Sequence, residues 1–139
     1  MKVRLCIAVG TLLGMSAAGA LADDPKAFSC TFAAGAAFSY ERGAFKPERV
    51  GPISMEIGKV NVDIQSAELL GDGSARPLRV VRAVNALHFI EVVGEGFLNM
   101  TTIYDKDDAN GVHPAVHSRH FGVLGQPVIG QYQGFCHGK

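Results

Sequence analysis

Short runs of alternating apolar and polar residues, separated by glycine- and proline-bearing breaks, constrain this chain more than any other feature. Alternation with a period of two places successive side chains on opposite faces of a β-strand. Runs that recur about every 8–12 residues are typical of antiparallel sandwiches and barrels. The sequence therefore predicts an all-β fold of about eight strands. The predicted strands cover residues 28–32, 53–57, 60–64, 77–84, 87–93, 97–104, 112–121 and 128–136.

The first 22 residues have the three-part layout of a secretory signal peptide. Lys2 and Arg4 precede a short apolar run, and Ala20 begins the Ala-Leu-Ala cleavage signal. Glycine and serine interrupt the run, whereas a membrane-spanning helix needs about 20 apolar residues. We therefore expect residues 1–22 to be removed. Residues 23–139 should then form a single β domain without a membrane anchor, located in the periplasm or secreted.

Two cysteines remain after removal of the leader, which carries Cys6. Cys30 and Cys136 lie near opposite ends of the mature chain, and in an exported protein such a pair most simply forms one disulfide. On the chain-entropy model, a bridge that closes so long a loop stabilises the fold by about 4–5 kcal/mol. The alternative is a pair of free thiols for redox chemistry, but the chain has no C-x-x-C motif.

The positions of the two cysteines favour a closed architecture. A meander with an even number of strands brings its first and last strands side by side, and Cys30 and Cys136 lie on those two strands. We therefore expect a small antiparallel meander β-barrel of about eight strands, with one disulfide joining the first strand to the last. A β-sandwich with linked edges is the alternative.

The charge balance excludes two classes of partner. Without Lys2 and Arg4, eleven basic residues remain against thirteen acidic ones, so the mature domain is close to neutral. Nucleic acids and anionic bilayers both require a basic surface. Neither is therefore predicted as a partner.

Three histidines within eight residues form a concentrated group of candidate metal ligands. His113, His117 and His120 are spaced i, i+4 and i+7, so in a helix they could converge on zinc. The preceding Asn110-Gly111 is a hairpin signal, which favours a strand. In a strand His113 and His117 would lie about 13 Å apart on one face, with His120 on the other. The sequence therefore predicts neither a metal site nor a cofactor.

The same stretch supplies the candidate binding residues, His117, Ser118, Arg119 and His120. We expect residues 115–120 to pair antiparallel with part of residues 97–104. The apolar residues Val112, Pro114 and Val116 lie on the same face of this strand as Ser118 and His120. We therefore expect Ser118 and His120 to point inward, and His117 and Arg119 to point outward. Ser118 and His120 lack a Gly-x-Ser-x-Gly elbow and an assigned carboxylate, so no catalytic residue is predicted.

Two charges interrupt an otherwise apolar face of one predicted hairpin. If Asn85-Ala86 forms a two-residue turn, Arg82 and Glu91 become diagonal neighbours. Charged side chains on a buried face are rare unless they are paired. We therefore predict an ion pair between Arg82 and Glu91, with a structural role.

Two motifs carry a resemblance to known proteins. AVHSRH at 115–120 and QYQGFC at 131–136, together with TTIY, resemble a group of small exported bacterial proteins of unassigned function. The resemblance covers most of residues 28–136 and implies a periplasmic or secreted β domain with one disulfide. The expected architecture is also similar to that of periplasmic inhibitors of c-type lysozyme. This chain lacks their Ser-Gly motif before a tyrosine and has no tryptophan, so only the architecture is shared.

These observations favour an exported, non-catalytic binding protein, whose partner is an unknown small ligand or an envelope protein. The chain has no catalytic constellation, and it carries eight phenylalanines and three tyrosines. One alternative is a histidine-based, metal-dependent hydrolase. The other is a periplasmic inhibitor of a cell-wall enzyme.

Overall fold

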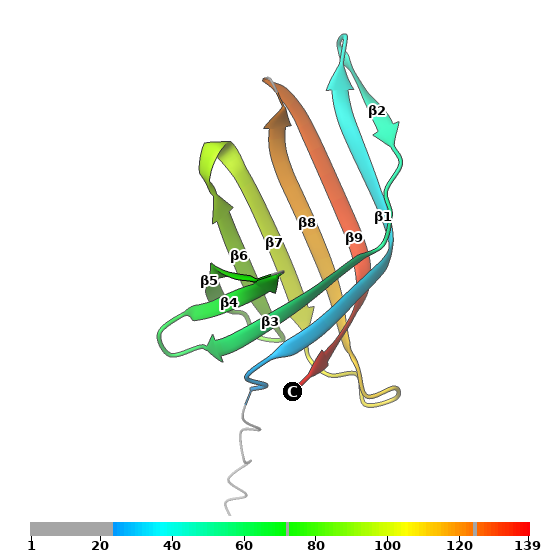
Figure 1. Cartoon of the computed structure of the whole chain (residues 1–139). Helices are drawn as coiled ribbons and strands as arrows, with labels where there is room; N and C mark the ends of the chain where they lie inside the picture. Colours follow the sequence, from blue (N-terminus) through cyan, green and yellow to red (C-terminus); the bar gives the residue numbers. More distant parts are fainter. Residues whose placement is uncertain (1–23, 72, 124) are drawn as a thin grey trace, which may run out of the picture.

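The computed structural model describes residues 24–71, 73–123 and 125–139, and the predicted signal peptide lies outside them (Figure 1). Nine strands are present in this part of the chain, with one short 3-10 turn, η1 (Gly94–Gly96). The strands are β1 (Phe28–Glu41), β2 (Ala44–Glu48), β3 (Ile53–Asn61), β4 (Ser66–Gly71), β5 (Ser74–Arg82), β6 (Ala86–Val93), β7 (Phe97–Tyr104), β8 (His113–Val123) and β9 (Gln126–Gly138). The all-β prediction is confirmed.

Antiparallel pairing of β1 with β9 closes the sheet into a barrel. The strands β3 to β9 follow one another as a meander, and β1 completes the ring between β9 and β3. The barrel therefore has eight strands, and β2 is an extra strand that pairs only with β1. The predicted meander barrel is confirmed, and the sandwich alternative is wrong.

Strand β1 is long, and along the edge that does not pair with β9 its two halves pair with different strands. Residues 28–32 pair with β3, and residues 37–41 pair with β2. Arg42 (φ 50°) and Gly43 (φ 85°) form the tight turn between β1 and β2, where a two-residue hairpin requires positive φ values. The β1–β2 hairpin consequently projects beyond the short strands β3, β4 and β5 (Figure 1).

Aromatic and branched side chains fill the closed part of the barrel. Phe28, Phe32 and Phe89 are almost completely buried, and the rings of Phe28 and Phe89 meet edge to face. Gly134 permits the close approach of β9 to β1, because a Cβ there would lie 2.0 Å from the carbonyl oxygen of Thr31. The register of β1 shifts next to this contact, between Phe32 and Ala34. The fully buried apolar side chains also include Ile57, Val80 and Ile103.

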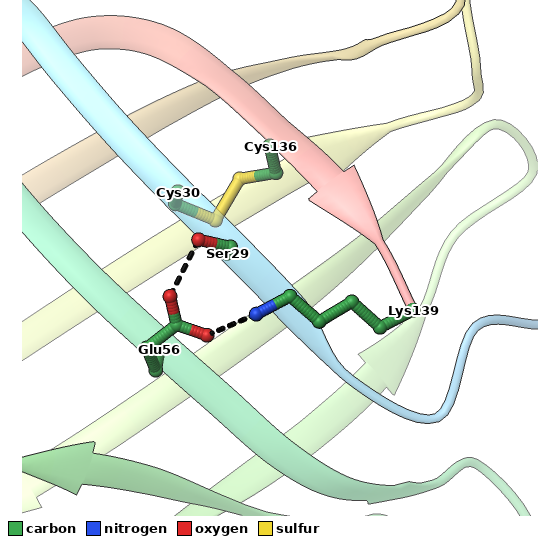
Figure 2. A network of polar contacts seen from close by, with 5 residues as sticks. All are labelled: Ser29, Cys30, Glu56, Cys136 and Lys139. Carbon is green, nitrogen blue, oxygen red and sulfur yellow. Dashed lines mark hydrogen bonds and ion pairs between the residues drawn. A yellow bond between two sulfur atoms is a disulfide. The ribbon is translucent and has the colours of Figure 1, made fainter.

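The predicted disulfide is present, and it locks the barrel closure. Cys30 lies directly opposite Cys136 in the β1–β9 ladder, and both residues are buried. On the outer side of β1, Glu56 of β3 accepts hydrogen bonds from Ser29 Oγ and from Lys139 Nζ, the latter at 2.9 Å (Figure 2). One covalent bond and a polar network thus join β1, β3 and the segment that ends in Lys139 (Figure 2).

The predicted ion pair between Arg82 and Glu91 is wrong. Val84 and Asn85 form the turn, one residue earlier than expected, so Arg82 lies opposite Leu87. This change shifts the pairing by two residues and leaves every side chain on its predicted face. Glu91 is buried inside the barrel, where its Oε1 lies 3.1 Å from Nε of Arg76. Arg82 lies at the end of β5 and pairs with Asp24 instead.

Replacing both Cys30 and Cys136 by alanine should lower the melting temperature by about 10–20 °C, because the unfolded chain regains the entropy of a very long open loop. Thermal unfolding followed by circular dichroism measures this shift. Intact mass after alkylation supplies the control, because the oxidised protein should take up label only after reduction. Two cysteines that react freely before reduction would contradict the disulfide.

Candidate functional site

Strand β8 carries all four predicted binding residues, and its period of two divides them between the faces of the barrel. The predicted strand and its pairing with β7 are confirmed. The predicted faces are wrong: His117 is buried inside, whereas His120 is exposed outside. The inward face was assigned from the apolar residues Pro114 and Val116. The outer surface of the barrel is apolar here as well, so apolar character does not identify the inner face.

Inside the barrel, one hydrogen bond and two aromatic rings hold the imidazole of His117 in place. Its Nδ1 lies 2.9 Å from Oγ1 of Thr101, which is directly opposite on β7. The rings of Phe32 and Tyr132 lie 5.7 and 6.1 Å from the imidazole, measured between ring centroids. Burial lowers the pKa of His117 to about 4, and the positive charge of Arg119 acts in the same direction. His117 is therefore uncharged at neutral pH.

The next inward row of the ladder holds further polar side chains of the interior. Glu91 of β6 lies opposite Asn99 of β7, which lies opposite Arg119 of β8. Asn99 Nδ2 donates a hydrogen bond of 2.9 Å to Glu91 Oε2. The Oε1 atom of Glu91 makes no hydrogen bond, but its negative charge lies beside Arg76. An arginine stays charged at physiological pH, so this row holds a buried carboxylate in place and offers no acid–base couple.

The three histidines do not converge. His113 and His117 share the inner parity of β8 and His120 has the outer one, as predicted for a strand. His113 Nδ1 donates a hydrogen bond to the carbonyl oxygen of Tyr104 at 2.9 Å, and its ring meets that of Phe28. Among residues 24–71, 73–123 and 125–139 no three His, Cys, Asp or Glu side chains are placed to hold a metal ion. The histidines of the described chain therefore do not assemble the site that a metal-dependent hydrolase requires.

Outside the barrel, Ser118 and His120 belong to a continuous surface without formal charge. The ladders align Leu98, His120, Ile129 and Phe38 in one row across β7, β8, β9 and β1. Equivalent rows lie along the same strands, and the outward residues of β2 extend them. We call this surface the uncharged face. It comprises Thr31, Ala34, Ala36, Phe38, Tyr40, Phe45, Pro47, Leu98, Met100, Thr102, Tyr104, Pro114, Val116, Ser118, His120, Ile129, Gln131, Gln133 and Phe135.

The uncharged face collects most of the large apolar side chains that the described chain exposes. Eleven such side chains are exposed in the structure, and only Ile64, Leu70 and Val84 lie elsewhere. The eight on the uncharged face are Phe38, Tyr40, Phe45, Leu98, Met100, Tyr104, Ile129 and Phe135, with exposed fractions of 37 to 55%. None of the outward positions that define the face is Asp, Glu, Lys or Arg.

The opposite outer wall has the usual character of a solvated surface. Strands β3 and β4 carry an ion pair between Lys59 and Glu68 at 2.9 Å, and Arg79 of β5 donates a hydrogen bond to Gln65. Glu56 of β3 takes part in the network with Lys139. Charges are therefore concentrated on one side of the barrel and excluded from the other.

Two open grooves mark the uncharged face. One, of about 240 Å³, lies between Phe38, Ile129 and His120, over Ala36 and Ser118. The other, of about 650 Å³, runs along the lower part of β9 beside Phe135 and Tyr104. Both lie where small side chains separate larger ones, so the surface has relief that a complementary surface could fill.

Sequence reasoning identified Ser118 and His120 but missed the surface to which they belong. A signal was present in residues 97–104, where Phe, Leu, Met and Ile occupy positions of both parities. Apolar residues on both faces of a strand indicate that both faces are covered. Residues 28–40 show the same pattern, with Phe32 inside and Phe38 outside.

No family model, curated protein or solved structure matches this chain. The motif resemblance to small exported bacterial proteins therefore stays a prediction. Within the described ranges, no helix has the length and apolar character needed to cross a membrane.

The free energy of unfolding should fall as the pH drops from about 6.5 towards 4. In this range the imidazole of His117 binds a proton in the unfolded chain but stays unprotonated in the folded chain. The loss over this window is on the order of 3 kcal/mol. The stabilisation is complete above the unfolded pKa and disappears towards the folded one. Urea unfolding at several pH values measures it.

The substitution His117→Gln should remove this part of the pH dependence, because glutamine does not titrate. His120→Gln is the matched control, since His120 lies exposed on the same strand and its replacement should leave the slope unchanged. An unaltered slope in His117→Gln would contradict the buried, neutral imidazole.

Proposed function

We propose that this protein is an exported, non-catalytic binding module that docks a protein partner on its uncharged face. The observation that carries the proposal is the concentration of exposed large apolar side chains on one wall of the barrel, at positions that include no Asp, Glu, Lys or Arg. Contiguous apolar patches of several hundred Å² are rare on monomeric proteins and mark interaction sites.

The composition of the face supports a protein partner. Tyrosine, phenylalanine and methionine are enriched in the centres of protein interfaces, and charged residues are depleted there. The face presents Tyr40, Tyr104, Phe135 and Met100 on its surface, each at least 37% exposed. The two grooves are open and lie on an outer wall, whereas sites for small ligands are concave and enclose most of the ligand. A broad opposing surface fits this geometry better than a small molecule.

The face is also rigid, which favours binding. Strands β8, β9 and β1 are paired on both sides, and the buried disulfide fixes β1 against β9 next to the row of Thr31 and Phe135. A partner that binds such a surface does not have to order it first, so little conformational entropy is lost on association. The face therefore acts as a preformed platform.

Two features of the chain support an exported location. The disulfide is compatible with an oxidising environment outside the cytosol, and the N-terminal sequence has the layout of a secretory leader. The partner is accordingly a protein of the periplasm, the envelope or the extracellular medium.

A photoreactive benzoylphenylalanine placed at Phe135, in cells that export the protein, should form a covalent adduct of defined mass with the partner. The side chain at Phe135 is 52% exposed and lies on the face. The same probe at Leu70, which is 43% exposed on β4, should form no such adduct. Gel mobility and mass spectrometry of the adducts provide the measurement.

A second substitution makes the test specific. Ile129→Lys puts a charge into the row of the face that holds Phe38 and Leu98 and should abolish the adduct from position 135, whereas Leu70→Lys should leave it intact. Equal adducts from Phe135 and Leu70, or an adduct that survives Ile129→Lys, would refute docking on the uncharged face.

A further inference from the structure

The occupant of the uncharged face can be specified further, on the condition that the proposed docking function holds. We propose that the face binds a second copy of this chain, so that the protein forms a symmetric dimer with two barrels packed wall to wall. In such a dimer the same surface is used by both copies, and every residue near the symmetry axis meets its own counterpart.

The absence of charge is the first argument for a second copy. A charged side chain near a two-fold axis faces the identical charge of the other subunit, which is unfavourable. Discrimination among different partners, by contrast, commonly relies on complementary charges. The uncharged face has none of the residues that would repel its copy and none that would select an oppositely charged partner.

The polar residues of the face are the second argument. Ser118 and His120 of β8 and Gln131 and Gln133 of β9 lie near its centre, and Ser118 is directly opposite Gln131. Serine, neutral histidine and glutamine each carry both a donor and an acceptor, so each can form hydrogen bonds with an identical residue. Aspartate and lysine cannot do so, because one only accepts and the other only donates. The polar centre is thus self-complementary.

The size of the face is the third argument. Four strands about 4.8 Å apart, with four outward rows about 6.7 Å apart, span on the order of 500 Å² in projection. Protruding rings such as Phe135 and Tyr104 and the outward residues of β2 enlarge the accessible area. A specific interface buries about 1,000 Å² or more in total, about 500 Å² from each partner, and the face reaches this size. The face is therefore large enough for a dimer at the lower end of specific interfaces.

The free edge of the sheet does not offer a competing route to dimerisation. Strand β2 is the edge strand, and its five residues include Pro47, which has no N–H group to donate. Lys46 and Glu48 also lie on this short strand. Short strands with proline and charges are the usual protection against edge-to-edge pairing. Wall-to-wall packing through the uncharged face is the remaining symmetric arrangement.

Sedimentation velocity of the purified mature protein, with its disulfide intact, tests the inference. At about 100 µM the protein should sediment with twice the monomer mass, because this concentration is well above a micromolar dissociation constant, the weak end of the range for standard interfaces. High salt should not dissociate the dimer, since no ion pair holds it. Ile129→Arg should halve the mass, because the two introduced charges come close together. Leu70→Arg, on the opposite wall, should remain dimeric.

Two further measurements keep a negative result interpretable. The circular dichroism spectrum of Ile129→Arg should match that of the parent protein, because the substituted position is exposed, and so should its melting temperature at concentrations at which the parent is monomeric. Benzoylphenylalanine at Gln131, irradiated in the purified protein, should give a cross-linked dimer, and the probe at Leu70 should not. This second variant tests the contact without adding charge.

The outcomes separate this inference from the proposed function. A monomer at all concentrations, with no cross-linked dimer from Gln131, would overturn self-association. If Phe135 nevertheless gave an adduct with a different protein in cells, docking on the face would stand and only the identity of the partner would change. A monomer with no adduct from the face in cells would overturn both.

Discussion

The pairing of β1 with β9 is the constraint on which the rest of the structure depends. It joins the two ends of the chain, closes the ring of eight strands and brings Cys30 opposite Cys136. Without this ladder the meander would be an open sheet with two long unpaired edges, which is prone to association. The disulfide and the network around Glu56 both lie at this junction, so covalent and polar interactions strengthen the same contact (Figure 2).

The small size of the closed barrel limits how many apolar side chains fit inside it. The interior is filled by Phe28, Phe32 and Phe89, and glycine at 134 is needed where β9 approaches β1 most closely. An eight-stranded barrel has room only for such side chains inside. The remaining apolar residues of the long strands therefore lie outside, where they form a surface that only association can bury. The grooves beside Phe38 and Phe135 belong to that surface.

Much of the fold could be predicted from periodicity and cysteine placement, because both are local or countable properties of the sequence. The meander, the disulfide and most of the strands are examples. The strand predicted at residues 60–64 is wrong, because residues 62–65 form the turn between β3 and β4, and β2 and β4 were not predicted. The inward direction of His117 could not be predicted, since its apolar neighbours Pro114 and Val116 face a surface that is itself apolar. The predicted ion pair between Arg82 and Glu91 was wrong for a different reason. The turn lies one residue earlier than expected, which moves the pairing of β5 with β6 by two residues and gives Glu91 a different partner, Arg76. Register depends on turn geometry, which the dipeptide Asn85-Ala86 did not specify.

The position of the uncharged face across the β1–β9 junction has a consequence for timing. Its rows run through strands separated by about the whole length of the mature domain, and contacts between such distant segments are costly to form because a long loop must close. Neither half of the chain carries the complete surface alone. If the face docks a partner as proposed, a chain whose barrel has not yet closed has no complete docking surface to offer. Closure of the barrel would then have to precede association.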